Sequence, residues 1–263
     1  MNATALIEQG MRIAPFIALV SVRVAVALAL MPAPFGELAP ARIRAALSFV
    51  LAFSLALPTL GSAFSLPTEP GPLLVCSLSE LLIGSVIGLT VRVTLAAAEA
   101  AGTLAGNAMG LGFANQIDPL FNSEGVPTTT LLSYLSVLIF FVLHGHHIVF
   151  QALSATLSIA PAGKGFPHFE PTHLMTVGSR VVAQGLRIAA PVVGTMFIVQ
   201  LGTALMARAA PKVQVFALTF GVSVTIGALV LVVCAPQVAQ GMAAIIANIP
   251  ETLGMLLSPA GAP

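Results

Sequence analysis

The sequence has 263 residues, of which 57% are hydrophobic and only 7% are charged, and its mean hydropathy is +1.02. Soluble domains carry about 25% charged residues, so this chain cannot cover a globule with polar surface and is expected to lie in a membrane. Its net charge is only +1 and it contains no basic run, which argues against a nucleic-acid partner.

The first three predicted helices are apolar runs bounded by prolines. Residues 10–31 form the first, which ends at Met31-Pro-Ala-Pro34 because proline lacks an N–H donor and clashes with the preceding turn. Arg23 lies in the middle of this run, where the core of a signal peptide is uncharged, so we expect the helix to be retained. A second helix covers about 41–57. The third runs from about 73 to 109, far beyond the roughly 20 residues that a bilayer requires.

Small residues and charges mark particular faces of the third helix. Its glycines at spacings of four are Gly84, Gly88, Gly102, Gly106 and Gly110. Such a spacing builds a flat surface that another helix can approach closely. Arg92, Glu99 and Gly106 repeat every seven residues and therefore share one face, which we expect to contact protein and not lipid.

An irregular segment, residues 109–127, follows the third helix. Its prolines and glycines oppose a regular helix, yet its leucine, isoleucine and phenylalanine side chains are too apolar for an ordinary surface loop. In a membrane protein, irregular backbone persists only where protein or a water-filled cavity surrounds it. We therefore predict a gate in a conduit, with an apolar constriction, glycine hinges and a turn at Asp118-Pro119. Ordinary core packing of these side chains is the alternative. The predicted gate residues are Gly110, Leu111, Gly112, Phe113, Ile117, Asp118, Pro119 and Phe121.

The second half of the chain predicts three further helical regions. Residues 125–163 contain no Lys, Arg, Asp or Glu, a fifth helix covers about 177–209, and a sixth covers about 213–249 with an interruption at Pro236. A tight basic turn separates the last two helices. Because the odd-numbered loops hold most of the basic residues, the positive-inside rule places this turn in the cytoplasm. The residues of the cytoplasmic turn are Arg208, Pro211 and Lys212. The predicted fold is all-α and polytopic, with about six long, broken helices.

Five charged side chains fall within predicted membrane spans. They are Arg23, Glu80, Arg92, Glu99 and Arg187. Each costs about 2.5–3.5 kcal/mol at the centre of a bilayer, so inter-helix pairs, neighbouring subunits or water must offset them. One interpretation is a proton or ion relay, and the other is structural ion pairing in a multi-subunit bundle. Because no two acids share a spacing, we favour structural pairing.

The histidines at 144, 146 and 147 suggest a metal site, because His144 and His147 are one helical turn apart. No Asp, Glu or Cys accompanies them in that run, so packed, hydrogen-bonded histidines are favoured. The sequence also lacks a Gly-x-Ser-x-Gly nucleophile elbow and a phosphate-binding loop. We therefore predict a protein that is not an enzyme, with no catalytic residue, no cofactor and no metal.

Several segments in order along residues 20–220 resemble the FliR/SctT family, the single-copy export-gate subunit of bacterial flagellar and virulence type III secretion systems. The segments are Met31–Gly36 with Pro40–Arg44, Glu80–Gly84 with Gly88, Gly110–Ala114 with Asp118-Pro119, Gly145–His147, and Arg208–Phe216. Two positions depart from the family pattern: His144 and Gln214 stand where the family usually has asparagine. Both residues keep the capacity for hydrogen bonding.

The resemblance implies a subunit of a helical, hetero-oligomeric channel for unfolded flagellar proteins, with residues 110–122 matching the family's plug. It implies a place in the bacterial inner membrane at the flagellar basal body, raised towards the periplasm within the assembly. The implied partners are two companion membrane subunits, in five and four copies, and an export switch protein. The chain, 1–263, would be one export-gate domain. Its residues 1–175 resemble the larger companion, and residues 176–263 form a helical hairpin that resembles the smaller one.

Other functions remain open at this point. The equivalent gate subunit of a virulence injectisome is one, although Gly145–His147 and the Arg-Ala-Ala-Pro turn look more flagellar. A proton-coupled secondary transporter using Glu80, Arg92 and Glu99 is another, but the halves show no convincing internal repeat. An intramembrane hydrolase or metalloenzyme built on the histidines lacks accompanying carboxylates.

Overall fold

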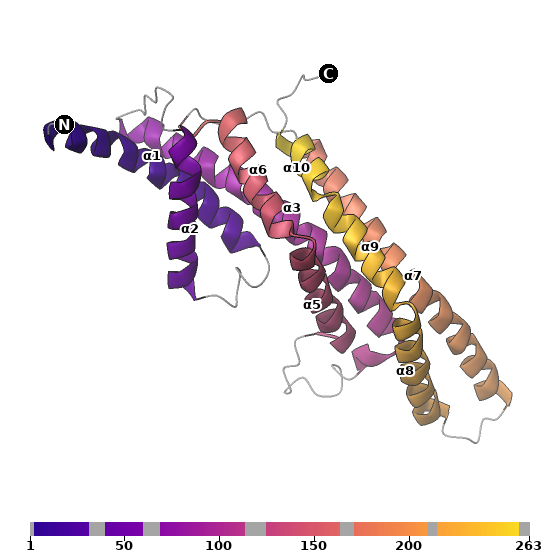
Figure 1. Ribbon diagram of the computed structural model, residues 1–263. Coiled ribbons are helices and arrows are strands. Elements are labelled where there is room, and N and C mark those ends of the chain that lie inside the picture. Colours follow the sequence, from indigo (N-terminus) through magenta and orange to yellow (C-terminus); the bar gives the residue numbers. More distant parts are fainter. Residues whose placement is uncertain are drawn as a thin grey trace. The chain divides into compact units, whose positions relative to one another are not determined.

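The computed structural model describes residues 3–31, 40–59, 69–113, 125–163, 171–209 and 215–257, and every regular element in these ranges is helical (Figure 1). The α-helices are α1 (Ala3–Leu30), α2 (Ala41–Ala56), α3 (Pro70–Ala108), α5 (Pro127–Val142), α6 (Gly145–Ile159), α7 (Pro171–Ala209), α8 (Val215–Val233), α9 (Ala235–Ala247) and α10 (Ile249–Leu257). Two short 3₁₀ turns, η1 (Leu57–Thr59) and η2 (Leu111–Phe113), follow α2 and α3. The predicted all-α fold is confirmed.

The described helices are long and apolar enough for several membrane crossings. Three segments qualify alone: Ile13–Leu30, Pro70–Ala108 and Met175–Ala209. Two bent pairs, α5 with α6 at 65° and α8 with the helix that follows it at 59°, raise the total to five if each pair is one broken span. The chain is therefore an all-α polytopic membrane protein, as its composition predicts.

The breaks within these spans have local backbone causes. His144 separates α5 from α6 with a φ of 55°, the left-handed conformation that few non-glycine residues adopt. The sixth predicted helix is interrupted at Cys234, just before α9, and Pro236 lies in the first turn of α9. A proline at that position loses no helical hydrogen bond. By contrast, Pro15 and Pro191 lie inside α1 and α7 without ending them, as is common where neighbouring helices surround the chain.

The chain forms two compact units, each built from stretches that are distant in sequence. Unit 1 comprises Met1–Arg92, His144–Val177 and Asn248–Pro263, and unit 2 comprises Val93–Leu143 and Gly178–Ala247. Within unit 1, α1 packs against α2, and α10 packs against α6. Within unit 2, α5 packs against α9.

The core of unit 2 depends on small side chains of α3. One cluster joins α3, α5, α7 and α9, and it contains Ala97, Ala98, Ala101, Leu132, Ile188, Ala189, Val238, Met242 and Ile245. A second cluster joins Ala105 and Met109 to Val192 and Met196. Because alanines occupy these α3 positions, larger side chains of α7 and α9 can pack close to the α3 backbone.

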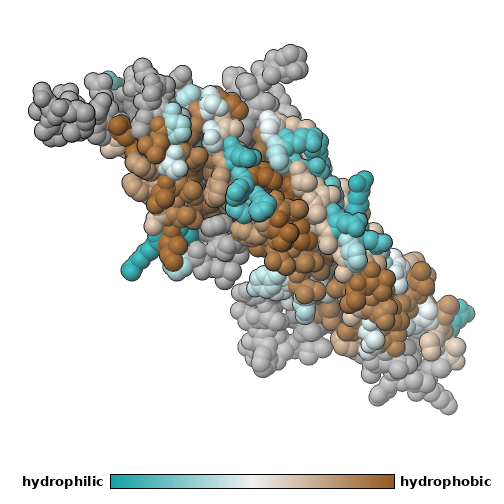
Figure 2. All heavy atoms as spheres, in the orientation of Figure 1, coloured by the Kyte–Doolittle hydropathy of each residue, from teal (hydrophilic) through white to brown (hydrophobic). Residues whose placement is uncertain are grey.

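Large apolar side chains also remain at the surface. Leu74, Val142 and Val232 are 70%, 68% and 73% exposed, and Figure 2 shows apolar residues over most of the coloured surface in that view. A soluble monomer rarely exposes so much contiguous apolar area. This surface is suited to lipid or to partner helices.

Candidate functional site

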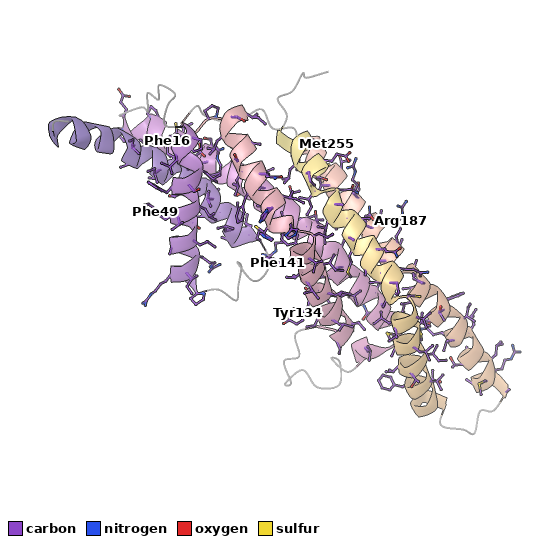
Figure 3. All side chains as sticks on the ribbon, in the orientation of Figure 1. Phe16, Phe49, Tyr134, Phe141, Arg187 and Met255 are labelled. Carbon is purple, nitrogen blue, oxygen red and sulfur yellow. The ribbon has the colours of Figure 1, made fainter. Side chains whose placement is uncertain are left out.

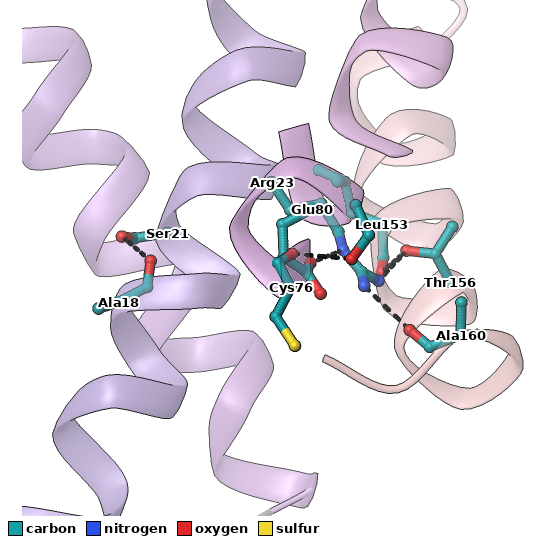
Figure 4. A network of polar contacts seen from close by, with 9 residues as sticks. Ala18, Ser21, Arg23, Cys76, Glu80, Leu153, Thr156 and Ala160 are labelled. Carbon is teal, nitrogen blue, oxygen red and sulfur yellow. Dashed lines mark hydrogen bonds and ion pairs between the residues drawn. The ribbon is translucent and has the colours of Figure 1, made fainter. Parts of the chain in front are cut away.

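A buried ion pair joins α1 to α3 in unit 1 (Figure 4). Arg23 Nε lies 2.6 Å from Glu80 Oε2, and both side chains are only 1% exposed. The other two guanidinium nitrogens donate to Thr156 Oγ1 and to the backbone carbonyl oxygen of Ala160, each at 2.9 Å. One cation therefore links α1, α3 and the end of α6.

The surroundings of Arg23 suit a buried cation. A buried charge is costly unless it is paired and hydrogen-bonded, and here each of the three guanidinium nitrogens has an acceptor. Ala160 is the C-cap residue of α6. Carbonyl groups at a helix C-terminus carry partial negative charge, so a cation at this position is favourable. Loss of either Arg23 or Glu80 would leave the other charge buried and without its counterion.

Two glycines of α3 allow its close packing against α1 in unit 1. A Cβ at Gly84 would overlap the backbone carbonyl oxygen of Arg23, and a Cβ at Gly88 would lie 2.7 Å from that of Ala27. Any larger residue at these two positions would push the helices apart. The close approach lies one turn from Glu80, so the glycines bring the α1 and α3 backbones to the distance at which the ion pair forms.

The other predicted packing glycines lie against α5 in unit 2. A Cβ at Gly102 would lie 2.6 Å from the backbone oxygen of Thr128, and a Cβ at Gly106 would overlap Thr128 Oγ1. The Thr128 hydroxyl donates to the carbonyl oxygen of Gly102 at 2.7 Å, and the hydroxyls of Thr103 and Thr129 lie 2.9 Å apart. Polar contacts therefore accompany the close approach of α3 and α5.

The remaining three predicted span charges lie at the surface of the chain. Arg92, Glu99 and Arg187 are exposed, and among the described residues none of them forms an ion pair. The side chain of Arg187 is labelled in Figure 3. Glu99 Oε1 accepts a hydrogen bond from Ser133 Oγ at 3.1 Å. Gly106, predicted to share a face with Arg92 and Glu99, is buried.

The predicted gate is only partly described. Gly110, two residues after the end of α3, has a φ of 83°, and Gly125, two residues before the start of α5, has a φ of 88°. Between them, η2 follows Gly110, and its Leu111 packs against the second core cluster of unit 2. Left-handed glycines thus flank the segment on both sides. The predicted gate residues Ile117, Asp118, Pro119 and Phe121 lie outside the described residues, so the gate stays a prediction.

The three histidines gather at the α5–α6 break. The ring centroids of His146 and His147 are 4.6 Å apart, and His144 lies 5.9 Å and 5.6 Å from them. Within the described ranges, no group of three or more His, Cys, Asp or Glu side chains could hold a metal ion. Of the predicted basic turn, Arg208 is exposed in the last turn of α7, while Pro211 and Lys212 lie outside the described residues.

Sequence reasoning did not identify Thr156 and Ala160 as partners of Arg23. They are 133 and 137 residues away along the chain, and both belong to a run without charged residues. A threonine hydroxyl and a backbone carbonyl carry no sequence pattern that distinguishes them from many others in the same run. Only tertiary packing brings them together.

Comparison with known proteins agrees with the predicted resemblance. The sequence matches the model of bacterial export proteins, family 1, over residues 14–249. It is 27% identical over 206 residues to flagellar biosynthetic protein FliR of Escherichia coli (strain K12), covering 76% of each chain. It is 28% identical over 214 residues to FliR of Caulobacter vibrioides, covering 80% of this chain and 84% of that one.

A similar relative carries a different name. Yop proteins translocation protein T of Yersinia pestis is 28% identical over 161 residues, which covers 60% of this chain and 62% of that protein. Since the family model extends over most of the sequence, the chain belongs to family 1 of the bacterial export proteins.

Proposed function

We propose that this chain is a membrane subunit of a type III protein export gate that serves flagellum assembly. The observation that carries the proposal is the family match over residues 14–249 in a chain whose described helices suit several membrane crossings. The relatives are named for flagellar biosynthesis and for translocation of Yop proteins. Because the family itself is described as bacterial export proteins, we infer that the chain acts in the bacterial inner membrane as a component of a conduit and not as an enzyme.

Flagellar export is favoured over export by a virulence injectisome. FliR of Escherichia coli and of Caulobacter vibrioides match 76% and 80% of this chain, but four other flagellar relatives match 58–63%, about the same share as the Yop translocation protein at 60%. The preference therefore rests on Gly145–His147 and the Arg-Ala-Ala-Pro turn, which resemble flagellar members of the family more closely. The partners are then the two companion membrane subunits, in five and four copies, and the export switch protein, in an assembly raised towards the periplasm.

We infer that residues 110–122 block the conduit when no substrate is present. The left-handed glycines Gly110 and Gly125 support this role, because each allows the backbone to turn sharply beside the segment. Leu111 packs against the core of unit 2 and so anchors the start of the segment there. Apolar side chains between these points would exclude ions by dewetting until a substrate displaced them.

Deletion of the gene in the bacterium that carries it tests the export function. The deletion strain is expected to lose flagellar filaments and to release no flagellar proteins into the medium, and a plasmid copy of the full chain is expected to restore both. Immunoblots of culture supernatants provide the measurement. Normal flagellar export in the deletion strain, together with loss of another secreted protein class, would instead support an injectisome gate.

Removal of residues 112–121 tests the plug. The assembled complex containing this deletion, reconstituted in vesicles, is expected to pass ions faster than the wild-type complex because the apolar constriction is gone. A fluorescent ion-flux assay reports the rate, and native mass spectrometry establishes that both complexes have the same subunits. Equal permeability of the two complexes would rule out the plug role while leaving the export function in place.

A further inference from the structure

One face of α7 in unit 2 carries two arginines on an uncovered seam. Two sets of residues at spacings of seven make up this face: Arg180, Arg187, Gly194 and Leu201, and then Ala183, Ala190, Phe197 and Ala204. All eight are exposed, and together they are called the α7 seam. The opposite face of the helix, with Ile188, Val192 and Met196, is buried in the core of unit 2. One face of α7 is therefore packed against the rest of unit 2, and the other face is uncovered.

The composition of the α7 seam suits another helix. Positions that recur every 3.5 residues on average stay in register with a helix packed alongside. Ala183, Ala190 and Gly194 are small enough for a neighbouring backbone to come close. A Cβ built at Gly194 would meet no atom within 4 Å, so the space beside it is open. Further along, Phe197 and Leu201 are 62% and 51% exposed and offer larger apolar contacts.

The two arginines give the α7 seam its charge preference. They lie about 10 Å apart along the helix axis. Neither forms an ion pair with another described residue, whereas Arg23 in unit 1 has its carboxylate partner at 2.6 Å. Within the described ranges, the chain thus supplies a counterion for Arg23 and none for Arg180 or Arg187. The α7 seam therefore suits a partner that supplies two anionic groups.

A purely lipid environment does not suit the α7 seam, whether Arg187 lies in the hydrocarbon layer or at the lipid headgroups. If Arg187 lies in the hydrocarbon layer, its guanidinium group has no counterion there. If Arg187 lies at the lipid headgroups, Arg180 is about 10 Å further out, in water. The side chain of Val182, which is 70% exposed and lies between the two arginines in sequence, would then face water as well. A neighbouring protein helix would supply counterions for the arginines and would shield the apolar side chains from water in either position.

We propose that the α7 seam is the docking surface for one membrane-spanning helix of a companion export-gate subunit, and that this helix carries two carboxylate side chains, about seven residues apart, that pair with Arg180 and Arg187. The proposal rests on the proposed function, because the gate assembly provides the companion. Opposite charges in a contact that excludes water select the partner and set its register along the helix.

Co-purification of the full-length chain with its companion subunits tests the charge pairing. The double variant Arg180→Glu/Arg187→Glu is expected to recover roughly tenfold less companion subunit, because like charges would meet in the contact. Arg180→Lys/Arg187→Lys keeps the charge and is expected to recover more than the glutamate variant does. Arg42→Glu, which changes an exposed arginine of α2, is the matched control and is expected to behave as the wild type. Native mass spectrometry of the tagged complex measures the recovery.

A photo-crosslinking amino acid at Ala190 or Gly194 identifies the occupant without changing either arginine. The expected adduct is with a companion helix that carries Asp or Glu, and substitution of those acids by arginine is expected to restore recovery of the Arg180→Glu/Arg187→Glu variant. Adducts with lipid alone, or equal recovery of companions by the wild type and the glutamate variant, would overturn the α7 seam as a docking surface. If the wild-type chain recovers no companion at all, the proposed function fails and this proposal fails with it.

Discussion

At the scale of single residues, the Arg23–Glu80 pair makes stability depend on both partners at once. The two charges are nearly inaccessible to solvent, and Thr156 and Ala160 satisfy the rest of the guanidinium group. Removing one charge strands the other in a low-dielectric core, whereas replacing both with apolar side chains of similar volume removes that penalty. The sequence indicates that Arg23 and Glu80 need partners, but nothing in their spacing of 57 residues shows that they partner each other.

Arg23→Met is expected to lower the free energy of unfolding by about 3–5 kcal/mol, because Glu80 then stays buried without its counterion. The double variant Arg23→Met/Glu80→Leu is expected to be less destabilised than the single one. Denaturant titration in detergent micelles, followed by circular dichroism, measures both. Arg42→Met changes an exposed arginine and is expected to shift stability by less than about 0.5 kcal/mol. Similar losses for Arg23→Met and Arg42→Met would contradict the importance of the pair.

Gly84→Ala in α3 and Gly202→Ala in α7 are expected to act in opposite directions. A Cβ at Gly84 overlaps the carbonyl oxygen of Arg23, so the change should cost about 1–3 kcal/mol. A Cβ at Gly202 meets nothing within 4 Å, so the change should stabilise by about 0.4–1 kcal/mol through the unfolded chain. The same denaturant titration measures both variants. A stabilising effect of Gly84→Ala would show that α1 and α3 do not pack closely at this point.

At the scale of elements, the broken spans show what hydrophobic pattern can and cannot predict. Long apolar runs predict helices, and Pro58 and the prolines after Met31 mark helix ends because proline disrupts hydrogen bonding. The bend of 65° between α5 and α6 depends instead on one left-handed residue, His144, in a run without proline between Pro127 and Pro161. Periodicity carries no signal for a single backbone torsion. Likewise, the sequence predicts an interruption at Pro236, and the structure places it two residues earlier, at Cys234.

His144→Gly is expected to stabilise the chain by about 0.5–1 kcal/mol, since glycine adopts a positive φ without steric strain. His144→Val should destabilise it, because a β-branched residue strongly disfavours this conformation. Thermal unfolding in detergent provides the comparison. His147→Ala, at an exposed helical position one turn away, controls for loss of an imidazole from the same cluster. If the His144→Val variant were more stable than the His144→Gly variant, residue 144 would not have the left-handed conformation.

At the scale of the whole molecule, composition alone predicts a polytopic helical membrane protein, because 7% charged residues cannot solvate a globule. Composition does not predict which stretches of the chain come together in each of the two units. Unit 1 combines three separate stretches, so its contacts connect residues such as Arg23 and Ala160 that no local pattern relates. Composition and the family resemblance predict the gate residues from Ile117 to Phe121, and the deletion of residues 112–121 tests their role.

The chain produced alone in detergent is expected to form heterogeneous aggregates, and co-expression with companion subunits should raise the monodisperse fraction several-fold. The reason is the exposed apolar surface, including Phe49 and Phe53 of α2 at 57% and 46% exposure and the α7 seam. Size-exclusion chromatography with light scattering measures the fraction. The Arg180→Glu/Arg187→Glu variant should lose most of this gain. A monodisperse single chain without companions would contradict the need for protein cover.

The pairing of Arg23 with Glu80 also has a consequence for the order of events during synthesis. The ribosome adds Glu80 57 residues after Arg23, and Ala160 137 residues after it. At about 5–20 residues per second, the carboxylate emerges roughly 3–11 seconds later than the arginine that it neutralises. Throughout that interval the nascent chain presents a lone cation to the insertion machinery. The charge of Arg23 in α1 therefore stays without its counterion until α3 has been made.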